Sequence, residues 1–143
     1  MAACRCGQLS VTCTEEPVRV SVCHCLACQK RSGSAFAVQA RWPEEDVEVS
    51  GTTAVWERVA DSGLRATYRF CPQCGSTLIY VNEGWPGVVA IPVGAFSDPD
   101  FPPPRHSVYE HRKHPWVEIC GDEVAHASET APLVRTRLDR NSD

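Results

Sequence analysis

The spacing of the cysteines constrains this chain more than any other feature of its sequence. Nine cysteines stand against one methionine among 143 residues. Because nine is an odd number, internal disulfides cannot pair all of them. No basic segment followed by an apolar one opens the sequence, so we expect no secretory signal, reduced thiols and a cytoplasmic location. Clustered cysteines in such a protein bind metal or carry out redox chemistry.

Seven of the nine cysteines fall in three short groups. Residues i and i+2 of an extended chain project from the same face, so a Cys-x-Cys pair can reach one ion. In the third group, Pro72 favours a turn and Gly75 lets the backbone bend just after the second cysteine. The spacing therefore predicts that most of the seven bind zinc. The groups are Cys4-Arg5-Cys6-Gly7, Cys23-His24-Cys25-Leu26-Ala27-Cys28 and Cys71-Pro72-Gln73-Cys74-Gly75.

Seven ligands divide naturally into four and three, which predicts two Zn²⁺ ions. Structural zinc takes four protein ligands, whereas catalytic zinc often takes three and keeps one position open. The first and third groups both end in Cys-Gly, so we assign them to one structural site. The middle group then holds a second ion at an exchangeable site, unless His24 or another side chain completes that site or it is empty. The predicted ligands are Cys4, Cys6, Cys71 and Cys74 for the first ion, and Cys23, Cys25 and Cys28 for the second.

The charge of the second site indicates which chemistry it suits. Three thiolates leave a zinc centre with net negative charge, which makes it a poorer Lewis acid, and a poorer activator of water, than zinc held by three neutral imidazoles. Such a soft ligand set accepts a further thiol, which would be held as thiolate. Lys30 and Arg31 follow Cys28 and can offset the added charge or pair with carboxylates of a thiol substrate. The alternative is that both are solvated surface charges.

His24 lies between two of the predicted ligands. In an extended segment its side chain points away from the face that Cys23 and Cys25 share. We therefore expect a supporting or substrate-facing role for His24 rather than direct ligation.

Almost every apolar stretch alternates with polar residues at a period of two, which indicates a mainly β, antiparallel fold with at most short helices. One short helix is predicted over Leu26–Ser32, ended by Gly33. Four prolines make Phe96–Arg105 a surface loop, and Val117 with Ile119 suggest a last strand. The other predicted strands are Leu9–Cys13, Val18–Val22, Phe36–Trp42, Val47–Val49, Leu64–Phe70, Thr77–Val81 and Val88–Val93.

The length and composition are those of one folded domain. We expect this domain to span residues 1–121, and residues 122–143 to form a C-terminal extension that frays over Arg135–Asp143. The net charge of -4 argues against nucleic-acid binding. The longest apolar runs, such as Val88–Val93, are too short to cross a membrane.

Several residues outside the three groups have two interpretations. We expect Cys13 and Cys120 to be buried as small hydrophobic residues rather than to bind metal. Three histidines near the Pro-rich loop can supply a general acid or base, although most such histidines are surface residues. Three aromatic residues can wall a pocket, and we favour core packing for them. The histidines are His106, His111 and His114, and the aromatic residues are Trp85, Phe96 and Trp116.

The complete set of motifs resembles the glutathione-dependent formaldehyde-activating enzyme family, which also includes centromere protein V. The resemblance spans roughly Cys4 to Ile119 and is far more specific than any single Cys-x-x-Cys motif. It implies a zinc-stabilised β fold of the Mss4-like type, with the structural and catalytic zinc ligands divided as above. The motifs are Cys4-x-Cys6-Gly7, Cys23-His24-Cys25-x-x-Cys28, Phe70-Cys71-Pro72-x-Cys74-Gly75, Asp98-Pro99, His106 and Trp116.

The family activity implied by this resemblance is the reversible addition of glutathione to formaldehyde, which gives S-hydroxymethylglutathione and is classed as a carbon–sulfur lyase reaction. The thiolate of glutathione would attack the formaldehyde carbon, and a nearby acid would protonate the alkoxide. His24 and water are both candidates for that acid. Formaldehyde remains the default substrate of the family, since nothing in Gly33–Ala40 or Phe96–Arg105 identifies glutathione.

Two other functions compete with a zinc-dependent lyase. One is a zinc-stapled module for protein interaction that carries out no reaction. The other is a redox enzyme of related fold in which a free cysteine, such as Cys120, is the nucleophile.

Overall fold

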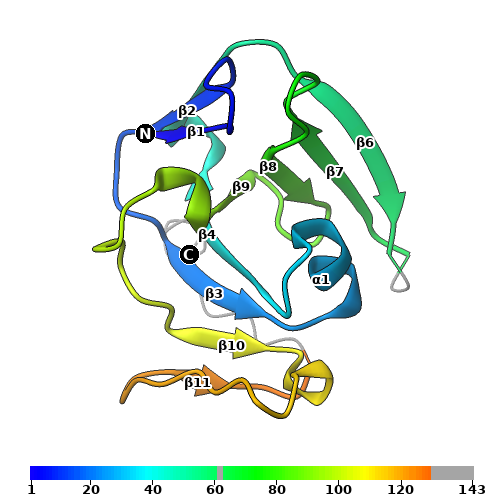
Figure 1. Cartoon of the computed structure of the whole chain (residues 1–143), viewed down its shortest axis with the longest axis vertical. Coiled ribbons are helices and arrows are strands. Elements are labelled where there is room, and N and C mark those ends of the chain that lie inside the picture. The colour runs from blue at the N-terminus through cyan, green and yellow to red at the C-terminus, as the bar shows by residue number, and fades with distance from the viewer. Residues whose placement is uncertain (61–62, 130–143) are drawn as a thin grey trace, which may run out of the picture. The chain divides into compact units, whose positions relative to one another are not determined.

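The structure, a computed structural model, describes residues 1–60 and 63–129 and consists mainly of β-strands (Figure 1). The described residues divide into two compact units. The first comprises residues 1–17 and 40–101, and the second comprises residues 18–39 and, of those described, 102–129. Strand β4 (Ala37–Pro43) contributes residues to both units.

The first unit begins with a three-stranded antiparallel sheet. Its central strand is β2, where Val11 lies opposite Ala2 on one side and Val49 on the other. Val11 and Ala2 are fully buried, so the alternation of the sequence places the apolar side chains on the inner face. The strands are β1 (Ala2–Ala3), β2 (Ser10–Cys13) and β5 (Val47–Ser50).

The rest of the first unit is an antiparallel meander. Trp56, Tyr68 and Tyr80 lie directly opposite one another on three neighbouring strands. Their ring centroids are 5.7 Å apart between Trp56 and Tyr68 and 5.4 Å apart between Tyr68 and Tyr80. Such cross-strand aromatic pairs fix the register of a sheet. The strands, in hydrogen-bonded order, are β9 (Val88–Pro92), β8 (Thr77–Asn82), β7 (Arg65–Phe70) and β6 (Ala54–Val59).

Trp42, near the end of β4, anchors the core of the first unit. Its side chain is fully buried, and its Nε1–H donates a hydrogen bond of 2.8 Å to the carbonyl oxygen of Glu15. Its ring packs against Phe96 and Phe101, with centroids 5.6 and 6.4 Å away. The indole therefore buries a large apolar surface while its polar atom is satisfied. Two 3-10 helices flank this core, η1 (Glu44–Asp46) and η2 (Val93–Phe96).

The second unit contains the only α-helix among the described residues. Strand β10 lies between β3 and β11 and runs parallel to both. Ser107 of β10 is thereby placed opposite Val22 on one side and His126 on the other. All five residues of β3 are buried, as expected for an interior strand. The elements are β3 (Arg19–Cys23), α1 (Leu26–Ser32), β10 (His106–Val108), η3 (Glu110–Arg112) and β11 (Ala125–His126).

The mainly β fold is confirmed, and the helix has the predicted limits. The parallel pairing of β10 was not predicted, because strands of two or three residues carry no visible alternation. The strand predicted at Val117 and Ile119 is wrong, since neither residue lies in a strand. The buried Val117 follows a turn and donates its N–H to the His114 carbonyl at 3.0 Å. The division at residue 121 stays a prediction, and the predicted frayed end over Arg135–Asp143 lies outside the described residues.

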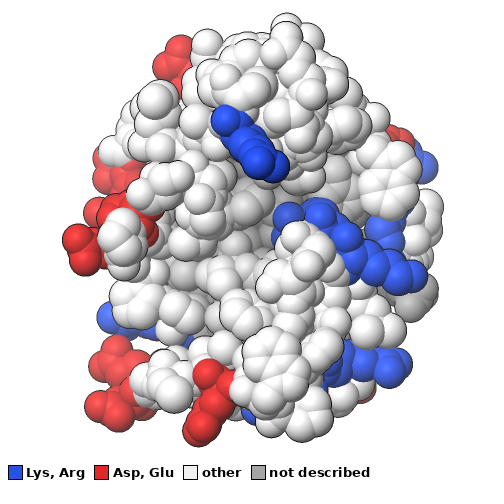
Figure 2. Space-filling view, in the orientation of Figure 1, with Lys and Arg blue, Asp and Glu red and all other residues white. Residues whose placement is uncertain are grey.

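No helix in the described parts of the chain has both the length and the apolar character needed to span a membrane. The face drawn in Figure 2 exposes both basic and acidic side chains.

Two substitutions on β8 separate core packing from strand propensity. Leu78 is 1% exposed and Val81 is 38% exposed. We expect Leu78→Ala to lower the free energy of unfolding by about 2–5 kcal/mol, because it leaves a cavity in the core. The matched change Val81→Ala should cost at most about 1 kcal/mol. Urea denaturation of the two variants measures the difference, and equal losses would contradict this description of the core.

Candidate metal centres

Four cysteine sulfurs meet in the first unit. The Sγ atoms of Cys4, Cys6, Cys71 and Cys74 all lie within 4.8 Å of one another. Cys6 Sγ is 3.6 Å from both Cys4 Sγ and Cys71 Sγ, although Cys6 and Cys71 are 65 residues apart in the sequence. The cluster therefore ties the N-terminal segment to the β7–β8 hairpin.

Two glycines shape the backbone around this cluster. Gly7 has a φ of 85° and donates its N–H to the Cys4 carbonyl at 3.0 Å. Gly75 has a φ of 78° and donates to the Cys71 carbonyl at 2.8 Å. A side chain is disfavoured at such positive φ values, which explains why each cysteine pair is followed by glycine. The two tight turns point both pairs of sulfurs at one place.

Neighbouring groups hydrogen-bond the sulfurs, and Cys6 Sγ itself donates to Gln73 Oε1 at 3.7 Å. The Leu9 N–H donates to Cys4 Sγ at 3.3 Å, and Gln8 Nε2 donates to Cys71 Sγ at 3.0 Å. Cys74 Sγ lies 3.4 Å from the Ser76 hydroxyl, and hydrogen bonds with the side chain and then the backbone of Ser76 are the largest of the effects that lower the pKa of Cys74 to about 5. Donors of this kind stabilise thiolates, the form in which cysteine binds metal.

The sulfur spacing fits a tetrahedral metal ion. Sulfurs that are 3.6 Å apart are too distant for a disulfide, whose S–S bond is about 2.05 Å long. Four sulfurs placed about 2.3 Å from a zinc ion at the corners of a tetrahedron lie about 3.8 Å apart. These two spacings are close to that edge length, and all nine cysteines of the chain are free thiols. The cluster could therefore hold a metal ion.

Three further sulfurs meet in the second unit, where β3 leads into helix α1. The Sγ atoms of Cys23, Cys25 and Cys28 lie within 4.8 Å of one another. Cys23 is the last residue of β3, Cys25 is the N-cap of α1, and Cys28 lies in the first turn. The Cys28 N–H donates to Cys25 Sγ at 3.4 Å, so the helix cap itself brings these two residues together. The motif therefore owes its geometry to a strand end and a helix start.

The three thiols of this cluster have different pKa values. Hydrogen bonds from Cys23 and then from Cys28 lower the pKa of Cys25, and the hydrogen bond to Cys25 raises the pKa of Cys23. The cluster thus stabilises one thiolate and opposes the ionisation of the others. A bound cation would remove that opposition, so the donor set fits a soft divalent metal.

The cations that follow Cys28 differ in their relation to the cluster. Hydrogen bonding with Cys23 lowers the pKa of Cys28, but hydrogen bonding with Cys25 and burial raise it, and the net pKa is above its ordinary value. The positive charge of Arg31 acts to lower the pKa of Cys28. Arg31 is half-buried, whereas Lys30 is exposed, and both lie in the last turn of α1. The charge of Arg31 therefore acts on the cluster.

A sequence model of one protein family matches residues 1–112, a span that includes all seven clustered cysteines. Its description is glutathione-dependent formaldehyde-activating enzyme. The chain belongs to this family. A comparison with curated proteins gives no significant match.

The fold of this family member is similar to that of a solved Rhodobacter sphaeroides protein. The two agree with a TM-score of 0.53 at 20% sequence identity, over 66% of this chain and 84% of that one. At this identity the likeness shows the fold alone. The name of the family is that of an enzyme, and the fold and both cysteine clusters agree with the expected Mss4-like architecture.

His24 does not join either sulfur cluster in the described structure. Its side chain is fully buried, and its Nε2 lies 2.9 Å from the Ser107 hydroxyl. Burial lowers the pKa of His24, so the ring is neutral at neutral pH. Of the other histidines, His114 Nε2 lies 3.0 Å from Gln29 Oε1, and the exposed His111 contacts the Ser128 carbonyl. The role of His24 stays a prediction, and this burial favours support over contact with substrate.

Tyr109 is a residue near the second cluster that the sequence analysis missed. It follows Val108, which lies opposite Cys23 in the β3–β10 pairing. Burial raises the pKa of Tyr109, and the three clustered cysteines raise it further. Its φ is 56°, in the left-handed region that a residue with a side chain rarely adopts. No motif marks such a position, because only the pairing of β10 with β3 places it beside the cysteines.

Other predicted residues lie elsewhere. Cys13 is half-buried, and its burial raises its pKa to about 11. The prediction that Cys120 is buried is wrong, since it is exposed and outside both clusters. Phe96 packs in the core as expected, whereas core packing is wrong for Trp116, which is 74% exposed.

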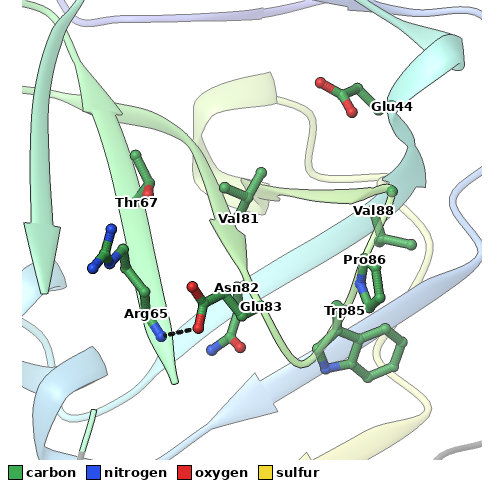
Figure 3. A pocket seen from close by; sticks show the side chains of 10 residues that line it. Glu44, Arg65, Thr67, Val81, Asn82, Glu83, Trp85, Pro86 and Val88 are labelled. Atoms are coloured by element: carbon green, nitrogen blue, oxygen red, sulfur yellow. Dashed lines mark hydrogen bonds between the residues drawn. The ribbon is translucent and has the colours of Figure 1, made fainter. Parts of the chain in front are cut away.

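A cleft of about 280 Å³ lies beside the β7 and β8 strands (Figure 3). Arg65 and Glu83 both line it, and the Glu83 carboxylate accepts the backbone N–H of Arg65 at 2.8 Å. Trp85 lines one side, and Arg41 lies 4.8 Å from the centre of its ring. No cysteine lines this cleft, so it is separate from the sulfur chemistry.

Two serine substitutions test the division of the sulfurs. Cys71 is fully buried and links segments far apart in the chain, so we expect Cys71→Ser to unfold the protein. Cys28 belongs to a local cluster, so Cys28→Ser should leave the protein folded and lower the metal content by about one ion. Thermal unfolding and elemental analysis measure both effects, with Cys120→Ser as the control. An equal loss of thermal stability in the two variants would contradict this division.

Proposed function

We propose that the protein is a zinc-dependent carbon–sulfur lyase that forms or cleaves a thiol adduct such as S-hydroxymethylglutathione. The main observation behind this proposal is that the seven sulfurs divide unequally, with four in one cluster and three in the other. Membership in a family named for glutathione-dependent formaldehyde activation supports the substrate class. A cytoplasmic location would keep the nine free thiols reduced and supply glutathione.

In this proposal the four-sulfur cluster holds a structural zinc ion and the three-sulfur cluster holds a catalytic one. Four protein ligands fill a tetrahedral zinc ion, whereas three leave one position for a substrate. When bound to Cys23, Cys25 and Cys28, zinc would supply a site that holds glutathione sulfur as thiolate. The rest of the reaction depends on residues of the chain itself.

The addition step needs a cation and a proton donor near the sulfur. The thiolate forms a bond to the formaldehyde carbon, and the carbonyl π electrons move to oxygen, which then takes a proton. The Arg31 guanidinium offsets the charge of the incoming thiolate and is suited to pair with a glutathione carboxylate. The Tyr109 hydroxyl is our candidate for the proton donor, since a phenol is protonated at neutral pH and the charges of all three cysteines act on its pKa. The fully buried His24 is less suited to that role.

Exchange of ¹³C-formaldehyde with S-hydroxymethylglutathione, followed by NMR, tests the proposed activity. We expect the zinc-loaded protein to raise the exchange rate above that of the spontaneous reaction. The Cys28→Ser variant, which keeps the four-sulfur cluster, should return the rate to the spontaneous value. X-ray absorption should show the average coordination rise from about 3.5 to about 4 sulfurs per zinc at saturating glutathione. An unchanged rate together with an unchanged sulfur shell would favour a non-catalytic module.

A matched pair of substitutions on helix α1 tests the role of the cations. We expect Arg31→Gln to raise the KM for glutathione about tenfold, because the half-buried guanidinium interacts with the cluster. Lys30→Gln removes the same charge from the exposed side of the last helical turn and should change KM less than about twofold. Steady-state kinetics of both variants decide the point. Equal effects would show that only the total charge of the helix matters.

A further inference from the structure

A chain of hydrogen bonds runs outward from His24 through the second unit. His24 Nε2 lies 2.9 Å from the Ser107 hydroxyl, and both side chains are fully buried. The Ser107 side chain hydrogen-bonds the Glu110 carboxylate. Glu110 Oε1 lies 2.6 Å from His126 Nδ1, and the His126 side chain is 46% exposed. The chain therefore connects the residue between Cys23 and Cys25 to the protein surface.

The chemistry of these groups fixes the direction of each bond. Burial raises the pKa of Glu110, but hydrogen bonds from His126 and then Ser107 outweigh it and lower the pKa below its ordinary value. The ionised carboxylate only accepts, so the Ser107 hydroxyl donates its proton to Glu110. The Ser107 oxygen then accepts from His24 Nε2–H. His24 is thereby held in one tautomer, with an unprotonated Nδ1 that is buried and finds no hydrogen-bond partner among the described residues.

The same strand also holds the backbone of His24. The His24 N–H donates to the Val108 carbonyl at 3.1 Å, one residue beyond Ser107 on β10. The β3–β10 register places Ser107 opposite Val22 and Val108 opposite Cys23. His24 is thus held through its side chain and its backbone by one short strand. His24 separates Cys23 from Cys25 in the chain, so this double attachment restrains the backbone between the two sulfurs.

The outer end of the chain comes from a segment beyond the family match, which ends at residue 112. Strand β11 places His126 opposite Ser107. Backbone hydrogen bonds continue the attachment, from the Ala127 N–H to the Ser107 carbonyl at 2.9 Å and from the Tyr109 N–H to the Glu129 carbonyl at 2.7 Å. The C-terminal segment therefore covers the strand that holds His24.

We propose that Ser107, Glu110 and His126 form a hydrogen-bonded relay that positions His24, and through it Cys23 and Cys25, for metal binding. This inference rests on the proposed use of the three-sulfur cluster as a metal centre. The three relay residues are positioning residues, since they act through His24 and hydrogen-bond none of the clustered sulfurs. Buried hydrogen-bond networks hold side chains in single arrangements, and the loss of groups that orient metal ligands commonly costs 10–100-fold in affinity.

Two variants at the outer end of the relay test it in the full-length protein. Glu110→Ala removes the group that orders the Ser107 proton, and His126→Ala removes the partner that fixes Glu110. We expect zinc affinity at the three-sulfur cluster to fall about 10–100-fold in Glu110→Ala and severalfold in His126→Ala. The four-sulfur cluster, whose ligands all lie in the first unit, serves as an internal reference and should keep its affinity. Competition with a chromophoric chelator measures both constants.

The matched control is Glu123→Gln on the same C-terminal segment. Glu123 pairs with Arg105 at 3.5 Å, and both side chains are more than 70% exposed, so its loss should change neither affinity. Long-range ¹H–¹⁵N NMR of the zinc-loaded protein adds a readout that general destabilisation does not mimic. It should show His24 protonated on Nε2 in the wild type and as a tautomer mixture in Glu110→Ala.

Three results would overturn the relay. The first is wild-type affinity at the three-sulfur cluster in both alanine variants. The second is an equal loss of affinity at both clusters, which would indicate a general effect on folding. The third is a wild-type His24 protonated on Nδ1. Binding of only one ion by the wild type would instead count against the proposed function, and the tautomer measurement would still test the relay.

Discussion

Thiolates brought together require a positive charge to hold them, and this electrostatic requirement underlies both halves of the structure. Seven sulfurs gather in two places at distances too long for disulfides and too short for several negative charges to coexist unaided. The strands and helices of each unit are short, so a metal ion would add stability that these short elements do not supply. A metal ion at each cysteine cluster would therefore both neutralise the thiolates and stabilise the fold.

The two clusters meet this requirement in different ways. The four-sulfur cluster joins residues 65 positions apart, and its sulfurs accept hydrogen bonds from Gln8 and Leu9. The three-sulfur cluster comes from six consecutive residues at the junction of a strand and a helix. Breaking a long-range link releases a large loop, whereas breaking a local one changes little beyond the site. This contrast is the physical basis for assigning structure to one cluster and reactivity to the other.

Local spacing made much of this architecture predictable. The Cys-Gly turns, the helix over Leu26–Ser32 and most strands of the first unit follow from residues close together in the sequence. The missed features depend instead on pairings between distant segments. Tyr109 comes near the second cluster, and Ser107 reaches His24, only because β10 pairs in parallel with β3, and β10 has three residues. Trp116 and Cys120 were placed in the interior on residue type alone, which fails where the chain turns on the surface.

The surroundings of the three-sulfur cluster combine two inputs of different character. Arg31 acts through charge on Cys28 from the helix side, and the relay acts through His24 on Cys23 and Cys25 from the strand side. Charge alters how strongly a thiolate is favoured, whereas hydrogen bonding fixes where the sulfur points. The two inputs therefore act on different cysteines of the proposed metal site.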